Sequence, residues 1–532
     1  MVSAQPDEDY GVTTVSQLVS ERAASHGDRL LLLYQDEEYT YGEIDEMANR
    51  IAGALAEDGV EKGDTIATFL YNSPEYLALW FGIAKLGAVM VPINVNLKAD
   101  GLSYMINDSQ AEITVLESET RENYETARDD LDDVTREYLL GEDSDEYRSF
   151  DELLFGDPDE FETPEIDVDD PMCIIYTSGT TGLPKGVVLP HYSYINTGSE
   201  FVRMTGLDTD DRPFTTLPLF HCNAQQLTVM GSMLEGTSFA LERWFSASSY
   251  WDQIRKYDAT IFNYLGTMIS VLNNQEPAPD DADNPAVYGV GAAAPAEIVD
   301  EFEERFDVEL VEGYGLTETG TVAIFNERGE ENRTNEGSIG VPVSYADVTI
   351  VDEKDRPVPA GEVGEIVVRP TRPNCFMLGY FEKPDKTVED WQNLWFHTGD
   401  LGYQDENGYF YFVDRKAYSI RRRGENIATQ EVEQVINDHP AVDESAVVGV
   451  PSELGEEDVK AYAILQPDRS MDPVDVVEQC ESRLAYFKVP RYVEFVDGFP
   501  KTATERVEKY KLKERGIDGA WDRKEAGYEL DR

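Results

Sequence analysis

Residues 176–186 read Tyr-Thr-Ser-Gly-Thr-Thr-Gly-Leu-Pro-Lys-Gly, a composition typical of a loop that holds phosphate groups. Hydroxyl side chains and backbone N–H groups around Gly179 and Gly182 are suitable donors to phosphate oxygens, and Lys185 adds a mobile positive charge. The apolar run at residues 172–175 predicts a buried strand directly before the glycines, and α/β folds bind ligands at the carboxyl ends of such strands. The stretch therefore predicts a phosphate-binding loop in an α/β protein, with a Ser/Thr/Gly hairpin of no function as the alternative.

Helix and strand patterns alternate through the first part of the chain. They predict helices at residues 16–24, 41–58 and 75–85 and strands at residues 66–70 and 88–93. This alternation is typical of an α/β fold with largely parallel sheets. Residues 117–170 are dominated by Asp and Glu, so we expect a solvated, variable excursion there.

A change of character near residue 414 predicts a domain boundary. An apolar strand pattern at residues 409–413 ends in Asp-Arg-Lys, and a compact stretch follows. Its predicted helices lie at residues 431–437 and 472–484, and its predicted strands at 446–450 and 460–465. We predict an N-terminal domain at residues 1–413, a C-terminal domain at 414–515 and a loosely held tail at 516–532.

The chain is strongly acidic. Its 532 residues include 44 Lys and Arg against 106 Asp and Glu, a formal net charge of −62. Such a charge argues against nucleic acid or an anionic membrane as a partner. Acidic chains are often disordered, but here apolar residues make up 41% and suffice for a folded core. Concentrated salt would screen the repulsion, because the Debye length at about 1 M is only about 3 Å, so we expect a halophilic source.

Cysteine usage and the amino terminus favour a cytoplasmic protein. Four widely separated cysteines form no Cys-x-x-Cys pair, so neither a disulfide framework nor a zinc site is indicated, and buried packing is their expected role. The first residues show no basic region followed by an apolar core, so no secretion signal is expected. The longest apolar stretch, residues 77–93, contains Lys85 and Pro92 and is not expected to span a membrane.

Further motifs follow the loop in a fixed order. They are Glu-Gly-Tyr-Gly-Leu-Thr-Glu-Thr at 312–319, Thr-Gly-Asp at 398–400, Asp-Arg-Lys at 414–416 and Gly-Glu-Asn-Ile at 424–427. Together they resemble the signatures of the adenylate-forming (AMP-binding) superfamily, which includes acyl-CoA synthetases, firefly luciferases and adenylation domains of peptide synthetases. The resemblance runs from Tyr39 to Lys513. It implies a large N-terminal domain of mostly parallel sheets layered with helices plus a β-barrel-like part, and a small, mobile α+β C-terminal domain.

The resemblance also implies a nucleotide site. A carboxylate beside hydroxyls suits Mg²⁺, and Glu318 is implied to be the metal ligand. The implied ATP contacts come from Thr177, Ser178, Gly179, Thr180, Thr181, Gly182, Lys185, Gly291, Ala292, Ala293, Tyr314, Gly315, Thr317, Asp400 and Arg415. Among them, Thr317 would contact the α-phosphate, Tyr314 would pack on the adenine and Asp400 would hold the ribose with help from Arg415. Taken alone, Tyr314 suits a core aromatic, and Asp400 and Arg415 suit a surface ion pair.

His221 lies in the apolar segment Leu-Pro-Leu-Phe-His-Cys-Asn-Ala-Gln at 217–225. A satisfied core histidine is one reading of such a residue. In the family, this position lines the path between the acyl pocket and the incoming thiol. Residues 231–236 and 264–268 are then expected to line the acyl pocket, and their apolar character favours a carboxylic acid with an apolar body.

Two departures from the family pattern concern the C-terminal domain. The family motif Pro-Lys-Thr-x-x-Gly-Lys reads Pro-Lys-Thr-Ala-Thr-Glu-Arg at 500–506, so Arg506 takes the place of the catalytic lysine, with Lys501 and Lys509 as nearby alternatives. The hinge carries Tyr418 and a single glycine before the loop of Gly424, Glu425 and Asn426, which is implied to serve CoA. The basic run at 421–423 suits either CoA phosphates or a solvated turn.

We therefore predict an acyl-CoA synthetase, an acid–thiol ligase that forms AMP and diphosphate through an acyl-adenylate. Its catalytic residues are expected to be Thr181, Lys185, His221, Glu318 and Arg506, with ATP, Mg²⁺ and coenzyme A as cofactors. Segments 220–223 and 423–426 resemble the carnitine-CoA ligase-like or fatty acid-CoA ligase branch. The alternatives are an ATP-binding paralogue without turnover, an adenylating enzyme with a non-CoA acceptor, and a luciferase-like oxygenase. We expect a monomer or homodimer.

Overall fold

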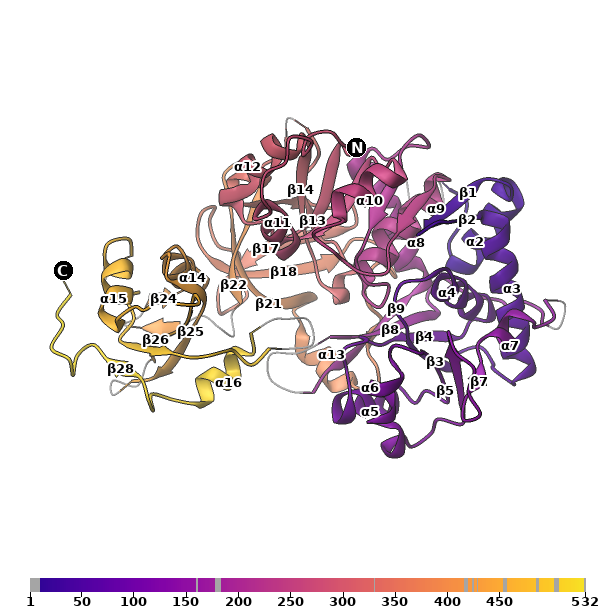
Figure 1. Ribbon diagram of the computed structural model, residues 1–532, viewed down its shortest axis with the longest axis horizontal. Coiled ribbons are helices and arrows are strands. Elements are labelled where there is room, and N and C mark those ends of the chain that lie inside the picture. Colours follow the sequence, from indigo (N-terminus) through magenta and orange to yellow (C-terminus); the bar gives the residue numbers. More distant parts are fainter. Residues whose placement is uncertain are drawn as a thin grey trace.

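The computed structural model describes residues 10–158, 161–177, 183–329, 331–415, 420–422, 425–427, 429–452, 457–484, 488–501 and 507–530, with only the backbone at 421, 425, 426 and 431. Two large sheets build the N-terminal domain, and a separate small sheet builds the C-terminal domain, which lies at one end of the molecule (Figure 1). Both large sheets contribute residues to the predicted nucleotide site.

An eight-stranded sheet carries the predicted phosphate loop. Its spatial order is β19 (Gly379–Tyr380), β9 (Lys185–Pro190), β8 (Pro171–Thr177), β4 (Val89–Pro92), β3 (Thr65–Phe69), β5 (Ile113–Glu117), β6 (Arg136–Leu140) and β7 (Arg148–Ser149). Neighbouring strands from β8 to β7 are parallel, whereas β9 is antiparallel to both β8 and β19. Apolar side chains cover both faces, as Ile66 belongs to one core and Ala67 to the other.

A fourteen-stranded sheet supplies the other half of the site. Its order is β17 (Ala346–Val351), β18 (Gly364–Pro370), β21 (Trp395–Gln404), β22 (Phe410–Arg415), β16 (Ser338–Pro342), β15 (Ile324–Phe325), β14 (Glu309–Tyr314), β13 (Tyr288–Ala292), β12 (Ile261–Leu265), β10 (Pro213–Thr215), β11 (Phe239–Leu241), β1 (Leu30–Tyr34) and β2 (Glu37–Thr40), with β20 (Trp391–Gln392) beside β21. Pairs from β14 to β1 are parallel, and those from β14 to β17 are antiparallel.

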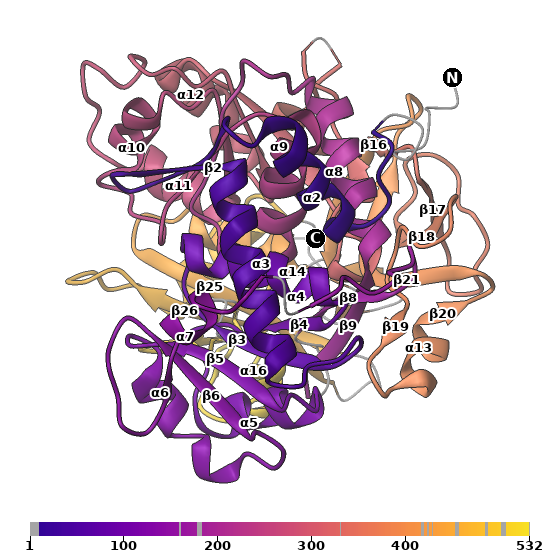
Figure 2. The same ribbon diagram turned by 90° about the vertical axis from the view of Figure 1, so that its right-hand side faces the viewer.

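Helices cover both sheets of the N-terminal domain. They are α2 (Val15–His26), α3 (Tyr41–Glu57), α4 (Pro74–Leu86), α5 (Ala99–Asp108), α6 (Arg121–Glu125), α7 (Asp151–Leu154), α8 (His191–Thr205), α9 (Met230–Glu235), α10 (Tyr250–Tyr257), α11 (Gly266–Asn273), α12 (Ala296–Phe306) and α13 (Pro384–Asp390), with a π-helical turn, η2 (Ala224–Val229). Helices α3 and α4 run side by side (Figure 2). No helix of the described residues is long and apolar enough to cross a membrane.

Local signals explain the helix ends that the sequence predicted correctly. Helix α3 begins with a capping box at Thr40, and α4 begins after Ser73, whose hydroxyl accepts the N–H of Tyr76. Helix α4 ends at Gly87, which adopts φ of 66°, a left-handed conformation that favours glycine. These short-range contacts are written in the sequence, so the helix boundaries could be predicted.

The C-terminal domain has its own four-stranded sheet and core. Its order is β25 (Val442–Pro451), β26 (Glu457–Leu465), β27 (Tyr492–Phe495) and β28 (Trp521–Asp522), with helices α14 (Thr429–Asn437), α15 (Pro473–Glu481) and α16 (Lys509–Glu514) and the hairpin of β23 (Ile420–Arg422) and β24 (Glu425–Ile427). The carboxylate of Asp414, at the end of β22, accepts the N–H groups of Thr429 and Gln430 at the start of α14. This contact joins the two domains.

Two sequence expectations need correction. The acidic stretch at 117–170 is not only a solvated excursion, because β6 and β7 extend the eight-stranded sheet. The expected loose tail is not loose over residues 521–523: β28 pairs with β27, and Asp522 forms an ion pair with Arg491 at 2.9 Å. Both strands depend on partners distant in sequence, which a local pattern does not reveal.

Candidate active site

The predicted phosphate loop joins two antiparallel strands. Strand β8 ends at Thr177, β9 begins at Lys185, and these two residues are paired across the ladder. Residues 178–182, which include the predicted phosphate ligands Ser178, Gly179, Thr180, Thr181 and Gly182, lie outside the described residues. The paired residues Thr177 and Lys185 carry a hydroxyl and an ammonium group that belong to the site, and the phosphate-binding role of the segment between them stays a prediction.

Lys185 is held by an acid that sequence reasoning missed. Its Nζ lies 3.0 Å from Oδ2 of Asp390, the last residue of α13. The ammonium also lies over the ring of Tyr380, 4.0 Å from the centroid, a favourable cation–π geometry. Tyr380 lies on β19, which pairs with β9, and this strand pairing brings a residue about two hundred positions downstream to the loop lysine.

Glu318 lies on the other side of Tyr380. The phenol oxygen of Tyr380 is 3.1 Å from Oε1 of Glu318 and 3.0 Å from Oδ2 of Asp390, and the hydroxyl of Thr177 is 3.4 Å from the same Glu318 oxygen. Burial raises the pKa of Glu318, although its backbone and nearby Lys185 act in the opposite direction. Hence Thr177 and Lys185 of the loop motif and Glu318 of the 312–319 motif lie in one polar cluster, and their contacts with a nucleotide stay a prediction.

Glu318 meets the chemical requirements of a single-carboxylate magnesium ligand. Its side chain is buried, carries hard oxygen atoms and is surrounded by hydroxyl groups of Thr177 and Tyr380. Among the described residues no group of three His, Cys, Asp or Glu side chains is arranged to hold a metal by itself. Magnesium usually uses one or two carboxylates with substrate phosphates and water, so this donor set fits a metal that arrives with the nucleotide.

Tyr314, Asp400 and Arg415 form a second polar group. The hydroxyl of Tyr314 donates to Oδ2 of Asp400 at 2.8 Å, and Nε of Arg415 lies 3.2 Å from Oδ1. Asp400 and Arg415 are paired directly across β21 and β22. The ion pair considered as an alternative exists, but Asp400 is buried at 2% exposure, so it is not a surface pair. The arrangement offers carboxylate oxygens and a guanidinium beside one aromatic ring.

The loop after β13 is organised by Glu312. Its buried carboxylate accepts the N–H groups of Ala293 and Ala294 and the hydroxyl of Tyr264, which lies 3.0 Å from Oε2. Ala293 has φ of 64°, a conformation that costs energy for a residue with Cβ, and these bonds stabilise it. Burial raises the pKa of Glu312 to about 7 despite the bonds.

Close backbone approach explains the glycines on either side of this loop. A Cβ at Gly291 would lie 2.2 Å from the carbonyl oxygen of Tyr264, and a Cβ at Gly315 would lie 2.1 Å from that of Thr321. Ala292 and Gly291 end β13 beside β12, while Gly315 follows β14. The predicted nucleotide residues of these two segments therefore lie at neighbouring strand ends.

The segment around His221 runs beside the Glu318 motif. The ring of His221 packs edge-on against Phe220, with centroids 4.8 Å apart, and Sγ of Cys222 lies 3.8 Å from the hydroxyl of Thr317. Within the next turn, the hydroxyl of Thr321 donates to the amide oxygen of Gln226. Cys173, Cys375 and Cys480 are buried and Cys222 is half-buried, and all four are free thiols. The segment that carries His221 therefore contacts the segment that carries Thr317, and the role of His221 in the thiol path stays a prediction.

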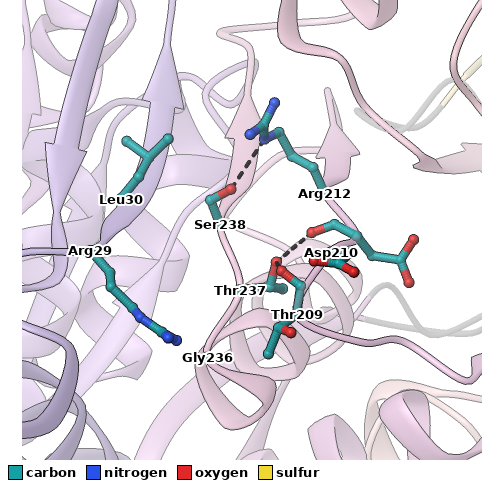
Figure 3. Close-up of a pocket in the computed structure, with 9 residues that line it drawn as sticks. Arg29, Leu30, Thr209, Asp210, Arg212, Gly236, Thr237 and Ser238 are labelled. Carbon is teal, nitrogen blue, oxygen red and sulfur yellow. Dashed lines mark hydrogen bonds between the residues drawn. The ribbon is translucent and has the colours of Figure 1, made fainter.

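Most of one predicted acyl-pocket segment lies in a buried helix. Residues 230–235 form the buried helix α9, and a Cβ at Gly231 would lie 2.6 Å from the ring of Phe201. Gly236 instead lines a polar depression of about 290 Å³ (Figure 3). The depression is lined by Arg29, Leu30, Thr209, Asp210, Asp211, Arg212, Gly236, Thr237 and Ser238. Helix α9 therefore packs in the core, and the expectation that 231–236 line the acyl pocket stays a prediction.

The two lysines considered as substitutes for Arg506 already have acidic partners. Nζ of Lys501 lies 2.9 Å from Oε2 of Glu444. Nζ of Lys509 lies 2.8 Å from Oε1 of Glu433 and 2.6 Å from the hydroxyl of Thr429, inside the C-terminal domain. Arg506 and Gly424 lie outside the described residues, and Glu425 and Asn426 are described by backbone only, in β24.

Arg422 departs from both alternatives expected for the basic run at 421–423. Arg422 is buried, its guanidinium lies 3.0 Å from Oδ1 of Asp458, and it donates to the carbonyl of Val489. It is therefore neither a CoA-phosphate ligand nor part of a solvated turn. Its burial depends on β26 and the segment before β27, which the local sequence does not indicate.

Comparison with known proteins agrees with this geometry. The sequence model of the AMP-binding enzyme family matches residues 19–381, and that of the AMP-binding enzyme C-terminal domain matches residues 431–506. The crotonobetaine/carnitine–CoA ligase of Salmonella agona (strain SL483) is 34% identical over 518 residues, which cover 94% of this chain and 99% of that protein.

Solved structures give the same result. The anthranilate CoA ligase AuaEII in complex with anthranoyl-AMP superposes with a TM-score of 0.84 at 28% identity and covers 94% of this chain and 97% of its own. The o-succinylbenzoate coenzyme A synthetase of Bacillus subtilis, in complex with ATP and magnesium ion, has a TM-score of 0.81 at 27% identity, with 93% and 99% covered. The chain belongs to the AMP-binding enzyme family.

Proposed function

We propose that this AMP-forming acyl-CoA synthetase joins a carboxylic acid with an apolar body to coenzyme A, using the polar clusters around Glu318 and Asp400. ATP-dependent synthesis through an acyl-adenylate is the activity of the chain, supported by its family and its full-length relatives. The observation that supports the residue assignment is that Glu318 lies in one largely buried polar cluster with Thr177 and Lys185, which are paired across β8 and β9 far away in sequence.

In the first half-reaction, a carboxylate oxygen of the acid attacks the α-phosphorus of ATP. The bond from that phosphorus to the bridging oxygen breaks, diphosphate leaves and an acyl-adenylate remains. We assign the phosphate contacts to Lys185, Thr317 and the residues at 178–182, the ribose to Asp400 with Arg415, and the adenine to Tyr314. Positioning and neutralisation of phosphate charge account for most of the rate acceleration that such a site can give.

Glu318 would hold Mg²⁺ through its buried carboxylate, with Thr177 and Tyr380 beside it. When bound, the metal supplies positive charge next to the phosphate oxygens. The carboxylate is fixed by its burial and by hydroxyl contacts, so the chain contributes a preformed ligand at low cost in side-chain entropy. Arg506 would add the positive charge that the family lysine supplies.

In the second half-reaction, the thiol sulfur of CoA attacks the acyl carbonyl carbon and AMP leaves with the bonding electrons. We propose that the C-terminal domain rotates between the two steps, withdrawing Arg506 and presenting the loop at 424–426. Lys509 is not the substitute catalytic cation in this proposal, because its ammonium is bound to Glu433. His221 would line the path of the thiol. Its neighbour Cys222 contacts Thr317, which places this segment beside the proposed phosphate site.

The class of acid is proposed from the predicted acyl-pocket segment at the junction of β12 and α11. Residues 264–268 supply Leu265, which is exposed, and Met268, which is buried, at the junction of β12 and α11. These side chains support an apolar acyl body. The high acidic charge supports a cytoplasm rich in salt as the working environment.

The test is diphosphate and AMP release with Mg·ATP in molar KCl across short, medium, branched and aromatic acids, with and without CoA. The panel includes crotonobetaine and carnitine, the acids in the name of the Salmonella relative. Glu318→Gln should lower turnover roughly a hundredfold, since it removes a charge next to the reacting phosphate. Glu406→Gln, at an exposed turn, is the matched control. ATP binding without diphosphate release from any acid would favour the paralogue without turnover.

A further inference from the structure

The loop lysine is already neutralised in the structure. Nζ of Lys185 lies 3.0 Å from Oδ2 of Asp390, and both side chains are mostly buried, with 17% and 21% of their surface exposed. The ring of Tyr380 covers the ammonium, and its hydroxyl lies 3.0 Å from the same Asp390 oxygen. A pair shielded in this way is stronger than a surface ion pair, because less water competes for the charges.

Asp390 is anchored independently of Lys185. It ends α13, and its other oxygen, Oδ1, lies 3.3 Å from Nζ of Lys386 one turn earlier. Burial raises the pKa of Asp390, but the contacts with Lys185 and Tyr380 outweigh this effect and leave the pKa lowered. Asp390 is therefore a fixed anion, held by its helix.

Lys185, in contrast, has one fixed end and one movable end. Its backbone belongs to the β8–β9 ladder, where it pairs with Thr177, so the Cα cannot follow a ligand. The four-carbon stem can rotate and move the ammonium without breaking the ladder. Phosphate oxygens entering the hairpin would compete with Asp390 for this one ammonium, and the Asp390 charge would repel them.

We propose that Asp390 is a resident counter-ion of Lys185 that a nucleotide triphosphate must displace, so that Asp390 sets the affinity for ATP. The inference rests on the proposed function, in which Lys185 contacts the phosphates. The competition of Asp390 for the Lys185 ammonium and its repulsion of phosphate both weaken ATP binding. Removing the charge of Asp390 should tighten ATP binding, with an expected change of roughly three- to tenfold.

The experiment measures the dissociation constant of Mg·ATP by calorimetry for the full chain in 1 M KCl, where the Debye length of about 3 Å suppresses distant charge effects. Asp390→Asn is compared with Glu389→Gln, which removes a negative charge from the preceding residue, whose carboxylate lies 2.8 Å from Nζ of Lys386. Asp390→Asn should tighten binding and lower the KM for ATP, whereas Glu389→Gln should change either value less than twofold. Melting temperatures verify that both variants are folded.

A double-mutant cycle assigns the effect to Lys185. The Asp390→Asn substitution is repeated in a Lys185→Met chain, where the gain in affinity should disappear because there is no ammonium to release. Equal or weaker binding by Asp390→Asn, or the same gain in the Lys185→Met chain, would overturn the proposal. If Lys185→Met alone binds ATP as tightly as the unmodified chain, the proposed role of Lys185 fails and the counter-ion inference fails with it. Diphosphate release by the unmodified chain tests the overall function separately.

Discussion

The hydroxyl of Tyr314 donates a hydrogen bond to the carboxylate of Asp400 at 2.8 Å, across 86 positions of sequence. The bond fixes the ring at the end of β14 against the strand β21. It thereby links the residue proposed for the adenine to the residue proposed for the ribose, and both are fixed before any nucleotide binds.

Tyr314→Phe should raise the KM for ATP roughly tenfold, because a hydrogen bond to a charged acceptor contributes about 1.5 kcal/mol or more. The ring remains, so the change isolates the hydroxyl. Steady-state kinetics with varied ATP measure it. Tyr411→Phe on the adjacent strand, whose ring stacks on Tyr403, is the control and should leave KM unchanged. An unchanged KM in Tyr314→Phe would mean that the Asp400 contact does not organise the nucleotide site.

Glu312 should make stability depend on pH near neutrality. Burial raises its pKa from 4.5 to about 7, so the folded chain holds a proton that the unfolded chain has lost. Stability should therefore fall as the pH rises from about 4.5 to about 7, and then level off. Glu433, whose pKa burial also raises to about 7, adds to the same trend.

Melting temperature in molar KCl between pH 5.5 and 8 measures this trend. Glu312→Gln should lower the melting temperature at every pH, because the amide offers one oxygen acceptor where the carboxylate offers two to the N–H groups of Ala293 and Ala294. It should also reduce the dependence of the melting temperature on pH. Glu303→Gln, at a half-buried acid of α12 that accepts the N–H of Leu310, is a control for loss of a nearby charge. A full slope in Glu312→Gln would show that another group titrates.

Lys509 and Arg506 should give opposite phenotypes. Lys509→Met leaves Glu433 buried without its cation and should lower the free energy of unfolding by roughly 3 kcal/mol, while adenylation per folded molecule is retained. Arg506→Ala should lower diphosphate release with little change in melting temperature. Thermal melts and diphosphate release measured on the same samples distinguish the two. Loss of adenylation in a fully folded Lys509→Met protein would instead make Lys509 catalytic.

Salt should determine the stability of the fold. The chain has a net charge of −62, and its carboxylates repel one another more strongly when the Debye length grows from about 3 Å at 1 M to about 10 Å at 0.1 M salt. The melting temperature should fall steeply as KCl is reduced over this range. A melting temperature independent of KCl would contradict the halophilic interpretation.

Sequence analysis found features that depend on contacts between neighbours in sequence. It missed residues that depend on contacts between distant strands. Helix α4 was predictable because Ser73 and Gly87 terminate it locally, and the loop before Lys185 because its composition is specific to phosphate. Tyr380 and Asp390 were missed because only the pairing of β19 with β9 brings them to the loop. All five residues from Ser178 to Gly182, and Lys185, were named as ATP contacts, and these contacts stay a prediction.

Buried ion pairs were the other source of error. Arg422 belongs to a basic run that was expected either to meet CoA phosphates or to form a solvated turn, yet Asp458 on β26 neutralises it in the interior. Likewise, β6 and β28 are short strands that contain charged residues, and they pair with β5 and β27 respectively. A charged side chain can be buried when an oppositely charged partner lies beside it, and in Arg422 that partner, Asp458, is distant in sequence.

Asp414 binds the start of α14, so the two ends of the segment that connects the domains are held together by one side chain. Its carboxylate accepts from the backbone of Thr429 and Gln430 and from the hydroxyl of Thr429 at 2.8 Å, so the chain leaves β22 and returns to the same side chain. A rotation whose pivot lies within this loop must release the carboxylate from the helix, at a cost of about 1 kcal/mol for a lost cap. A pivot before Asp414 would carry the capped helix as one unit. Whether the Asp414 carboxylate stays bound to the start of α14 therefore determines which part of the backbone would turn in such a rotation.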